Sequence, residues 1–269
     1  MSDDERAPDG AAATVVPRVE VRNLAKRYGS VHALRDVDMK LNAGEIVGLV
    51  GDNGAGKSTL VNLISGALQP TAGEILVDGK PVSFRSPSDA RRAGIETVYQ
   101  DLSLAPDLSI WANMFLGREK VSPGPLGWLG WLDRKAMMKQ TAEDLDRTRI
   151  KIASVGSRVG RLSGGQRQAV AVGRAVAWGS RVVLMDEPTA ALGVEQQARV
   201  GELIQTVASH GLPVLLISHN LQQVHAICHR IVVLFHGTAV ADLRPKDTEI
   251  DDIVGWITGS ALAAQRRTG

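Results

Sequence analysis

The sequence IVGLVGDNGAGKSTLVNLI, residues 46–64, places a glycine-rich segment between a strand-like apolar run and a helix-like apolar pattern. A strand that delivers such a turn into the start of a helix directs several backbone N–H groups at one point. The dipole of the following helix favours negative charge at the same point. Glycines at positions 51, 54 and 56 permit positive φ and close approach of the backbone. The segment therefore predicts a binding site for phosphate.

Residues 51–58 fit the whole P-loop pattern, GxxxxGKS, in its strand–turn–helix context. Lys57 can reach the β- and γ-phosphates of a nucleotide, and the Ser58 hydroxyl can ligate Mg²⁺. The residues that we expect to hold the nucleotide are Gly51, Asp52, Asn53, Gly54, Ala55, Gly56, Lys57, Ser58 and Thr59.

Length and composition limit the possible proteins. A chain of 269 residues that is 44% hydrophobic can bury one substantial core with a small appended subdomain, but not two catalytic domains. Its net charge of +2, without a long block of like charge, argues against an arm that binds nucleic acid. The single Cys228 excludes an intramolecular disulfide. Because there is no secretory pattern and no unbroken apolar run of about 18 residues, we expect a soluble, cytoplasmic protein.

Apolar runs along the chain predict its organisation. Alternation at residues 19–22 and a run at 75–77 predict an antiparallel β layer near the N-terminus. Short β-branched runs at 182–185, 214–217 and 231–235, separated by helical patterns, predict a parallel sheet wrapped by helices, an α/β fold. Residues 101–162 lack such runs and carry a helical pattern at 134–147, which predicts an inserted helical subdomain. The expected limits are a flexible tail at 1–17, one domain at 18–259 (core at 18–100 and 163–245, helical subdomain at 101–162), and a flexible tail at 260–269.

Two adjacent carboxylates follow the apolar run at 182–185. A buried strand that ends here places Asp186 beside the phosphate-binding loop, where it can hold Mg²⁺. Glu187, the next residue, can then polarise the attacking water. Together with the P-loop, this pair predicts hydrolysis of a nucleotide.

A pentapeptide, LSGGQ at residues 162–166, precedes a helical pattern at 167–178. Together with the P-loop it resembles the signature motif of ABC-type ATPases. The resemblance implies a P-loop NTPase with a RecA-like core, ATP as the nucleotide, and an ATP-bound homodimer. The signature residues that would bind the γ-phosphate of ATP held by the opposite subunit are Ser163, Gly164, Gly165 and Gln166.

The same resemblance assigns three more positions. Gln100 resembles the Q-loop glutamine that contacts Mg²⁺ or the lytic water, so the implied metal ligands are Ser58, Gln100 and Asp186. His219 resembles the switch histidine at the γ-phosphate, and Tyr28 the aromatic residue that stacks on adenine. One position departs from the family: Gly193 stands where an aspartate that couples the two sites is common.

Segments 94–100, 113–119 and 187–193 look most similar to ATP-binding subunits of bacterial importers of ribose, xylose and fructose, and the single cassette resembles the fructose type. This implies integral membrane permease subunits, a periplasmic sugar-binding protein, and a peripheral location on the cytoplasmic face of the bacterial inner membrane. The alternative is a soluble ABC ATPase that acts on nucleic acid or ribosomes; near-neutral charge, one cassette and the lack of a coiled-coil insertion weigh against it. We therefore expect no nucleic-acid partner. No residue specifies the sugar.

Two further patterns have competing interpretations. Residues 124–132 carry two of the five tryptophans among glycines. We expect this segment to pack on the helical subdomain; contact with a membrane partner or the membrane interface is the alternative. His225, Cys228 and His229 have helical spacing that suits a metal, but a packed helix face is the more common outcome.

Overall fold

The N-terminal layer is a four-stranded antiparallel sheet in the order β2-β1-β4-β5, which confirms the predicted β layer. The structure is a computed structural model that describes residues 16–124, 128–148, 150–190 and 192–268. Nearly all of the predicted tail at 1–17 lies outside these residues. The strands of this sheet are β1 (Val19–Tyr28), β2 (Val31–Leu41), β4 (Ala72–Val77) and β5 (Lys80–Val82).

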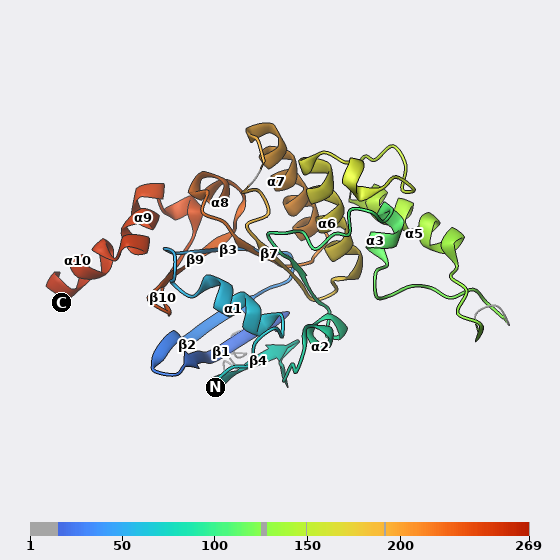
Figure 1. The fold of residues 1–269 in the computed structure, drawn as a ribbon. Coiled ribbons are helices and arrows are strands. Elements are labelled where there is room, and N and C mark those ends of the chain that lie inside the picture. Colours follow the sequence, from blue (N-terminus) through green and yellow to red (C-terminus); the bar gives the residue numbers. More distant parts are fainter. Residues whose placement is uncertain (1–15, 125–127, 149, 191, 269) are drawn as a thin grey trace, which may run out of the picture.

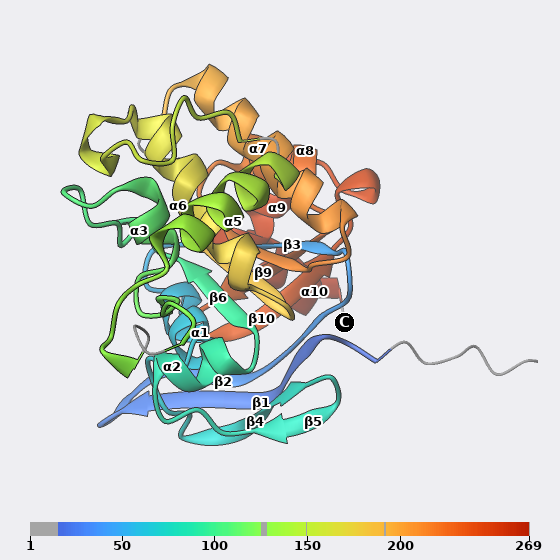
Figure 2. The same ribbon diagram turned by 90° about the vertical axis from the view of Figure 1, so that its right-hand side faces the viewer.

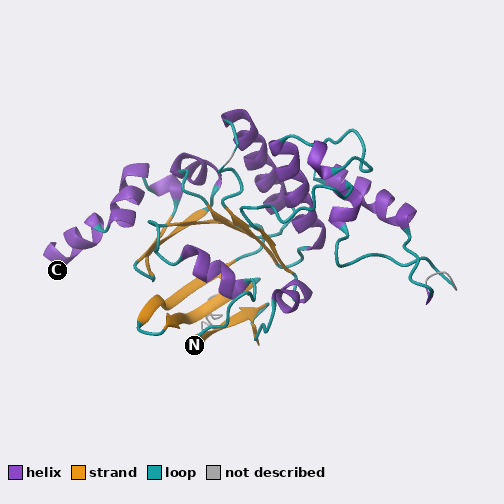
Figure 3. Ribbon diagram, viewed as in Figure 1, coloured by secondary structure: helices purple, strands orange, loops and turns teal. Residues whose placement is uncertain are grey.

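A six-stranded sheet in the order β10-β9-β3-β8-β7-β6 forms the centre of the molecule (Figure 3). All of its neighbouring strands are parallel except β9 and β10. Every residue of β3 and β8 is buried, which explains why the sequences of these strands are continuous apolar runs. The strands are β3 (Ile46–Val50), β6 (Ile95–Val98), β7 (Val182–Asp186), β8 (Val214–Ile217), β9 (Arg230–Phe235) and β10 (Thr238–Leu243).

Helices cover both faces of the central sheet. On one face α1 (Lys57–Ile64) lies between the two sheets (Figure 1), and its Leu60 joins a core with Leu24 and Leu184. On the other face, Val172 and Ile204 belong to a second core. The helices on that second face are α6 (Gly164–Trp178), α7 (Val194–Ser209), α8 (Leu221–Ile227) and α9 (Ile250–Thr258). The short α2 (Pro87–Arg92) precedes β6, and the 3₁₀ turn η2 (Pro245–Asp247) precedes α9. The predicted α/β fold is confirmed.

The chain between β6 and β7 forms a helical lobe, which lies to one side of the sheet in Figure 1 and faces the viewer in Figure 2. Before α6 it contains α3 (Ile110–Met114), α5 (Arg134–Arg147) and the 3₁₀ turn η1 (Val159–Arg161). A third core joins Phe115 and Met137 of the lobe to Val170 of α6. Because α6 also packs on the sheet, one helix ties the lobe to the central layer. The helices agree with the predicted pattern, and the exact limits at 101 and 162 remain predictions.

The C-terminal residues are helical, so the expectation of a flexible tail at 260–269 is wrong for the residues that the structure describes. Gly259, at φ +78°, ends α9 and starts α10 (Ser260–Thr268), which contacts α9. Alanine and leucine at positions 261–264 have high helix propensity, which explains the continuation. Gly269 lies outside the described residues.

Candidate functional site

The glycine-rich turn is shaped by three glycines with positive φ. Gly51 has φ +151°, and a Cβ there would lie 2.3 Å from the Leu234 carbonyl oxygen. Gly56 has φ +108°, and a Cβ there would lie 2.7 Å from the Ala33 carbonyl oxygen. Gly54 stands in open space, so its φ of +81° alone favours glycine. The turn is therefore packed between β9 and β2 and admits no side chain at Gly51 or Gly56.

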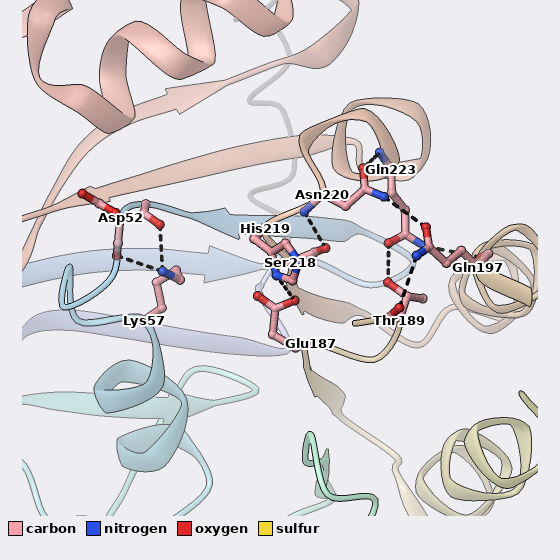
Figure 4. A network of polar contacts seen from close by, with 10 residues as sticks. Asp52, Lys57, Glu187, Thr189, Gln197, Ser218, His219, Asn220 and Gln223 are labelled. Carbon is pink, nitrogen blue, oxygen red and sulfur yellow. Dashed lines mark hydrogen bonds and ion pairs between the residues drawn. The ribbon is translucent and has the colours of Figure 1, made fainter. Parts of the chain in front are cut away.

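Lys57 starts α1 and folds back over this turn. Its Nζ donates hydrogen bonds to the carbonyl oxygens of Gly51 at 2.7 Å and Asp52 at 3.0 Å (Figure 4). The Asp52 carboxylate accepts a hydrogen bond from the backbone N–H of Asn53 at 2.7 Å. The structure thus brings the ammonium group to the turn whose backbone would surround a phosphate, as the sequence predicts.

Asp186 and Glu187 stand at the carboxyl end of β7, between β8 and β6. Burial raises the pKa of Asp186, the charge of Glu187 raises it further, and Lys57 opposes both effects. Glu187 has φ +51°, a conformation that costs energy for a residue with a side chain. Its backbone N–H donates to the Ile217 carbonyl oxygen at 3.0 Å, which fixes this unusual backbone to the end of β8.

Glu187 faces His219, which follows the end of β8. The His219 Nδ1 atom lies 2.8 Å from Oε2 of Glu187, an ion pair when the imidazole is protonated (Figure 4). The Glu187 side chain is 17% exposed and that of His219 is 72% exposed. The carboxylate is therefore held inside the edge of the sheet while the imidazole reaches the surface, an arrangement suited to a base beneath a group that contacts substrate.

A network of amides, which sequence reasoning missed, lies behind this pair (Figure 4). Thr189 Oγ1 donates to Gln223 Oε1 at 2.8 Å, and Asn220 Nδ2 donates to Gln197 Oε1 at 3.1 Å. Gln197 Nε2 also donates to the Leu192 carbonyl oxygen at 2.9 Å. The segment after Glu187 is thus fastened to α7 and to α8, the helix that follows His219. The one sequence signal was Asn220 with a glutamine three residues later, the pattern of a helix N-cap.

Gln100 lies two residues beyond the end of β6, at the same edge of the sheet as Asp186. Its side chain is exposed. The following turn places Leu102 and Ser103 at positive φ, and Arg174 of α6 donates to both of their carbonyl oxygens, at 3.1 and 2.8 Å. Arg174 was not predicted from the sequence. It connects the turn after Gln100 to the helix that begins at the LSGGQ motif.

Ser163 and Gln166 form a reciprocal cap at the start of α6. Ser163 Oγ accepts from the Gln166 backbone N–H at 3.2 Å, and Gln166 Oε1 accepts from the Ser163 backbone N–H at 3.0 Å. Together with Gly165 they border a cavity of about 980 Å³ that runs along α7. No residue of the glycine-rich turn is among those that line it. These signature residues therefore border a cavity that the P-loop of the same chain does not line.

Tyr28 ends β1, pairs with Val31 across the β1–β2 turn, and is 47% exposed. The Lys26 Nζ lies 5.2 Å from the centre of its ring. Ala33, in the same hairpin, borders Gly56 of the phosphate-binding turn. An exposed ring at this end of the hairpin fits a stacking surface for a flat base.

Of the three side chains predicted to hold Mg²⁺, Ser58 follows β3, Gln100 follows β6 and Asp186 is the last residue of β7; the carboxyl ends of these strands share one edge of the sheet. A hydroxyl, an amide and a carboxylate are oxygen donors of the kind that Mg²⁺ prefers. The cradle at Gly51 and Gly56, which a Cβ would fill, fits the accompanying phosphates. The residues present thus suit a nucleotide with its metal ion.

The alternative metal site at His225, Cys228 and His229 finds no support. Within the described residues, no three His, Cys, Asp or Glu side chains are grouped to hold a metal ion. His229 Nδ1 accepts from the Ile46 backbone N–H at 3.0 Å, and His225 Nε2 lies 2.8 Å from the Thr248 carbonyl oxygen. Burial raises the pKa of the Cys228 thiol to about 12. Only His225 lies on α8, because the helix ends at Ile227 and Cys228 already has extended geometry, so the expected packed helix face does not carry all three side chains.

Comparison with known proteins adds independent findings. The family described as ABC transporter matches residues 34–190, more than half of the chain. The chain is 52% identical to the fructose import ATP-binding protein FrcA of Rhizobium meliloti, over 91% of this chain and 95% of that protein. It is 45% identical to the xylose/arabinose import ATP-binding protein XylG of Sulfolobus acidocaldarius, with the same two coverages. The fold is similar to the dimeric post-hydrolysis structure of the ATP-binding cassette MJ0796 bound to ADP and Pi: the TM-score is 0.69 and the identity 25%, over 84% of this chain and 98% of that one.

Proposed function

This chain belongs to the ABC transporter family, and from that premise we propose that it is the ATP-hydrolysing subunit of an importer for a monosaccharide. The observation that carries the hydrolytic part is the pairing of Glu187 with His219 at the edge of the sheet that also ends in the P-loop. The similarity over nearly the whole length of the fructose and xylose/arabinose relatives supports the sugar part.

The P-loop residues hold ATP in this proposal. Backbone N–H groups of residues 53–59 and the Lys57 ammonium surround the phosphates, and Tyr28 stacks on the adenine. Ser58, Gln100 and Asp186 supply oxygen ligands for Mg²⁺. The metal, when bound, neutralises charge on the phosphates. Binding of a dication also favours the charged form of Asp186, which burial and Glu187 disfavour.

Glu187 acts as the general base. Its carboxylate accepts a proton from the attacking water, and its unusual backbone, fastened to Ile217, sets the direction of the side chain. His219 reaches beyond Glu187 to the surface, where an imidazole N–H can donate to a phosphate oxygen.

The site is completed by a second copy of the chain. Ser163, Gly164, Gly165 and Gln166 stand at the start of α6, and three of them border a cavity that their own P-loop does not line, so we assign this motif to the γ-phosphate held by the partner subunit. The dimeric state of the related MJ0796 cassette supports this assignment. Closure of the dimer on ATP and reopening after hydrolysis then form the working cycle.

Separate integral membrane permease subunits convert this cycle into transport, and a periplasmic sugar-binding protein delivers the sugar. No helix within the described residues is long and apolar enough to cross a membrane. A groove of about 360 Å³ lies between β6 and the helical lobe, lined by Glu96, Tyr99, Leu116 and Trp178 among others. We propose that a cytoplasmic helix of the permease docks there. The chain would then sit peripherally on the cytoplasmic face of the inner membrane.

Uptake measurements test the whole proposal. Cells that lack this gene should lose uptake of at least one of fructose, xylose, arabinose or ribose, and the wild-type gene should restore it. A gene that encodes Glu187→Gln should not restore uptake although the protein accumulates normally. If deletion changes the uptake of none of these sugars and instead impairs translation or DNA repair, the importer function is wrong and the soluble-ATPase alternative replaces it.

A further inference from the structure

The outer end of the helical lobe exposes an unusual amount of apolar surface. We call it the aromatic patch and define it as Leu116, Val121, Trp128, Leu129, Trp131 and Leu132. Trp128 is 98% exposed, Leu129 75% and Trp131 63%, whereas the other three tryptophans of the chain are at least partly buried. The expectation that this segment packs on its own subdomain is therefore wrong. Several large apolar side chains exposed within one short segment mark an interaction site.

The described part of the patch has an ordered base. Val121 and Leu132 form an antiparallel bridge, the Ser122 N–H donates to the Trp131 carbonyl oxygen at 2.7 Å, and the Asp133 N–H donates to that of Lys120 at 2.8 Å. The two arms of the segment are thus joined just before α5 begins. In Figure 1 the chain between α3 and α5 reaches away from both sheets, so the patch stands at an extremity of the molecule.

Positive charge accompanies the patch. Residues 116–139 contain five Lys or Arg and two Asp or Glu, an excess of three in a chain whose whole net charge is +2. Arg118 is paired with Glu96, and Lys139 lies 3.9 Å from Glu143. Arg134 and Lys135, both exposed at the start of α5, form no ion pair within the described residues. Two cations at a helix N-terminus are unfavourably placed for that helix, which indicates another role for them.

We propose that the aromatic patch is a lipid-contact surface for an anionic bilayer. Trp128 and Trp131 enter the interfacial region, where the amphipathic indole ring is favoured, and Arg134 and Lys135 meet the anionic headgroups. Apolar side chains alone suffice for contact with a protein partner. Exposed tryptophans next to Arg134 and Lys135, which form no ion pair within the described residues, match the chemistry of an anionic lipid surface. The patch also adjoins, through Leu116, the groove between β6 and the lobe.

Vesicle flotation with the purified full-length chain tests this directly. Wild-type protein should float with vesicles that contain phosphatidylglycerol and much less with pure phosphatidylcholine vesicles, and added salt should weaken the binding. Trp128→Ser combined with Trp131→Ser should lower binding about tenfold or more because both rings leave the interface. Arg134→Glu combined with Lys135→Glu should lower binding about fivefold or more for each reversed charge, on anionic vesicles only.

Two control variants match these changes elsewhere on the surface. Val31→Ser removes an apolar side chain that is also 63% exposed, and Lys246→Glu reverses an exposed charge far along the chain. Both should bind vesicles like wild type. The patch variants should keep wild-type ATPase activity and thermal unfolding, because the changed side chains lie outside the catalytic machinery.

Two results would overturn the proposal. The first is wild-type protein that does not bind anionic vesicles. The second is vesicle binding that the tryptophan variant leaves unchanged; if that variant also fails to assemble with membrane subunits or with its own copy, the patch is a protein contact instead. Neither outcome depends on which sugar is carried, so the test is separate from that of the importer function.

Discussion

The Nδ1 atom of His219 and Oε2 of Glu187 lie 2.8 Å apart although 32 residues separate them in the chain. They meet because β7 and β8 are parallel neighbours, so that the residues after both strands emerge at one edge. Asp186 precedes Glu187 at this edge, and the P-loop follows β3 on the other side of β8. The order of strands, rather than any local motif, therefore assembles the hydrolytic residues.

Removal of the base should separate binding from hydrolysis. Glu187→Gln keeps the shape of the side chain and loses its ability to accept a proton, so we expect the ATPase rate to fall about 10²-fold or more with ATP affinity retained. An ATP-stabilised dimer should accumulate, which size-exclusion chromatography with ATP would detect. The exposed Glu119→Gln serves as the matched control. Near-normal turnover of purified Glu187→Gln would remove Glu187 from its assigned role.

Mixed dimers test the composite site. Lys57→Ala and Ser163→Arg each inactivate a homodimer, but in a heterodimer both defects fall in the same site and the other site is intact. If one intact site suffices, an equal mixture should regain about a quarter of wild-type ATPase activity, since half of randomly assorted dimers are mixed. Activity of a variant that cannot dimerise would contradict the assignment of Ser163 to the partner's site.

Gly193 allows a prediction about the stability of the chain. It is the N-cap of α7, has ordinary extended geometry at φ −69°, makes no side-chain cap, and has open space where a Cβ would stand. Gly193→Asp should therefore raise the free energy of unfolding by about 0.5–1 kcal/mol, measured in urea, through capping and the helix dipole. Gly193→Asn should raise the free energy of unfolding by a smaller amount, because the asparagine side chain can cap the helix but carries no charge to interact with the helix dipole. Loss of stability in both would show that this position is constrained by something other than the helix end.

Glu96 should make stability depend on pH. Burial raises the pKa of Glu96 above 4.5, although Arg118 opposes this shift. Above pH 4.5 the unfolded chain has released this proton while the folded chain still holds it, so the free energy of unfolding falls as pH rises and levels off above the folded pKa. Urea titrations at a series of pH values should show that the free energy of unfolding of Glu96→Gln depends less steeply on pH than that of the wild type. Glu119→Gln should keep the wild-type slope; equal slopes in wild type and Glu96→Gln would contradict the prediction.

Much of the fold followed from local pattern. The run at 214–217 and the helix at 134–147 coincide with β8 and α5, because burial on both faces and a clear amphipathic period leave strong signals. The strand β10 (Thr238–Leu243) was not predicted, since its partly buried, mixed side chains give no such pattern. The C-terminal helix α10 was not predicted, because a segment of nine residues spans too few turns to show a clear helical period.

The sequence predicted those residues of the candidate site that belong to a recognisable motif, and it did not predict the others. The P-loop, Asp186 and Glu187 came from residue type and spacing. Thr189, Gln197 and Gln223 are common polar residues whose roles come from meeting across helices, which a sequence without contacts cannot specify. The role of each named residue in catalysis remains a prediction that the variants above will decide.

The helical lobe has mechanical consequences that follow from where it joins the sheet. The chain leaves at the end of β6 and returns into β7, and these strands lie side by side in parallel register. Because β6 and β7 are parallel, the carboxyl end of β6 and the amino end of β7 lie at opposite edges of the sheet, and α6 spans the distance between them. A displacement of the lobe is therefore carried along α6 across the face of the sheet. The hydrogen bonds of Arg174 to Leu102 and Ser103 join α6 to the turn after Gln100, so this turn moves together with α6. The segment between α3 and α5 reaches farthest from the two sheets, so it travels farthest when the lobe moves (Figure 1).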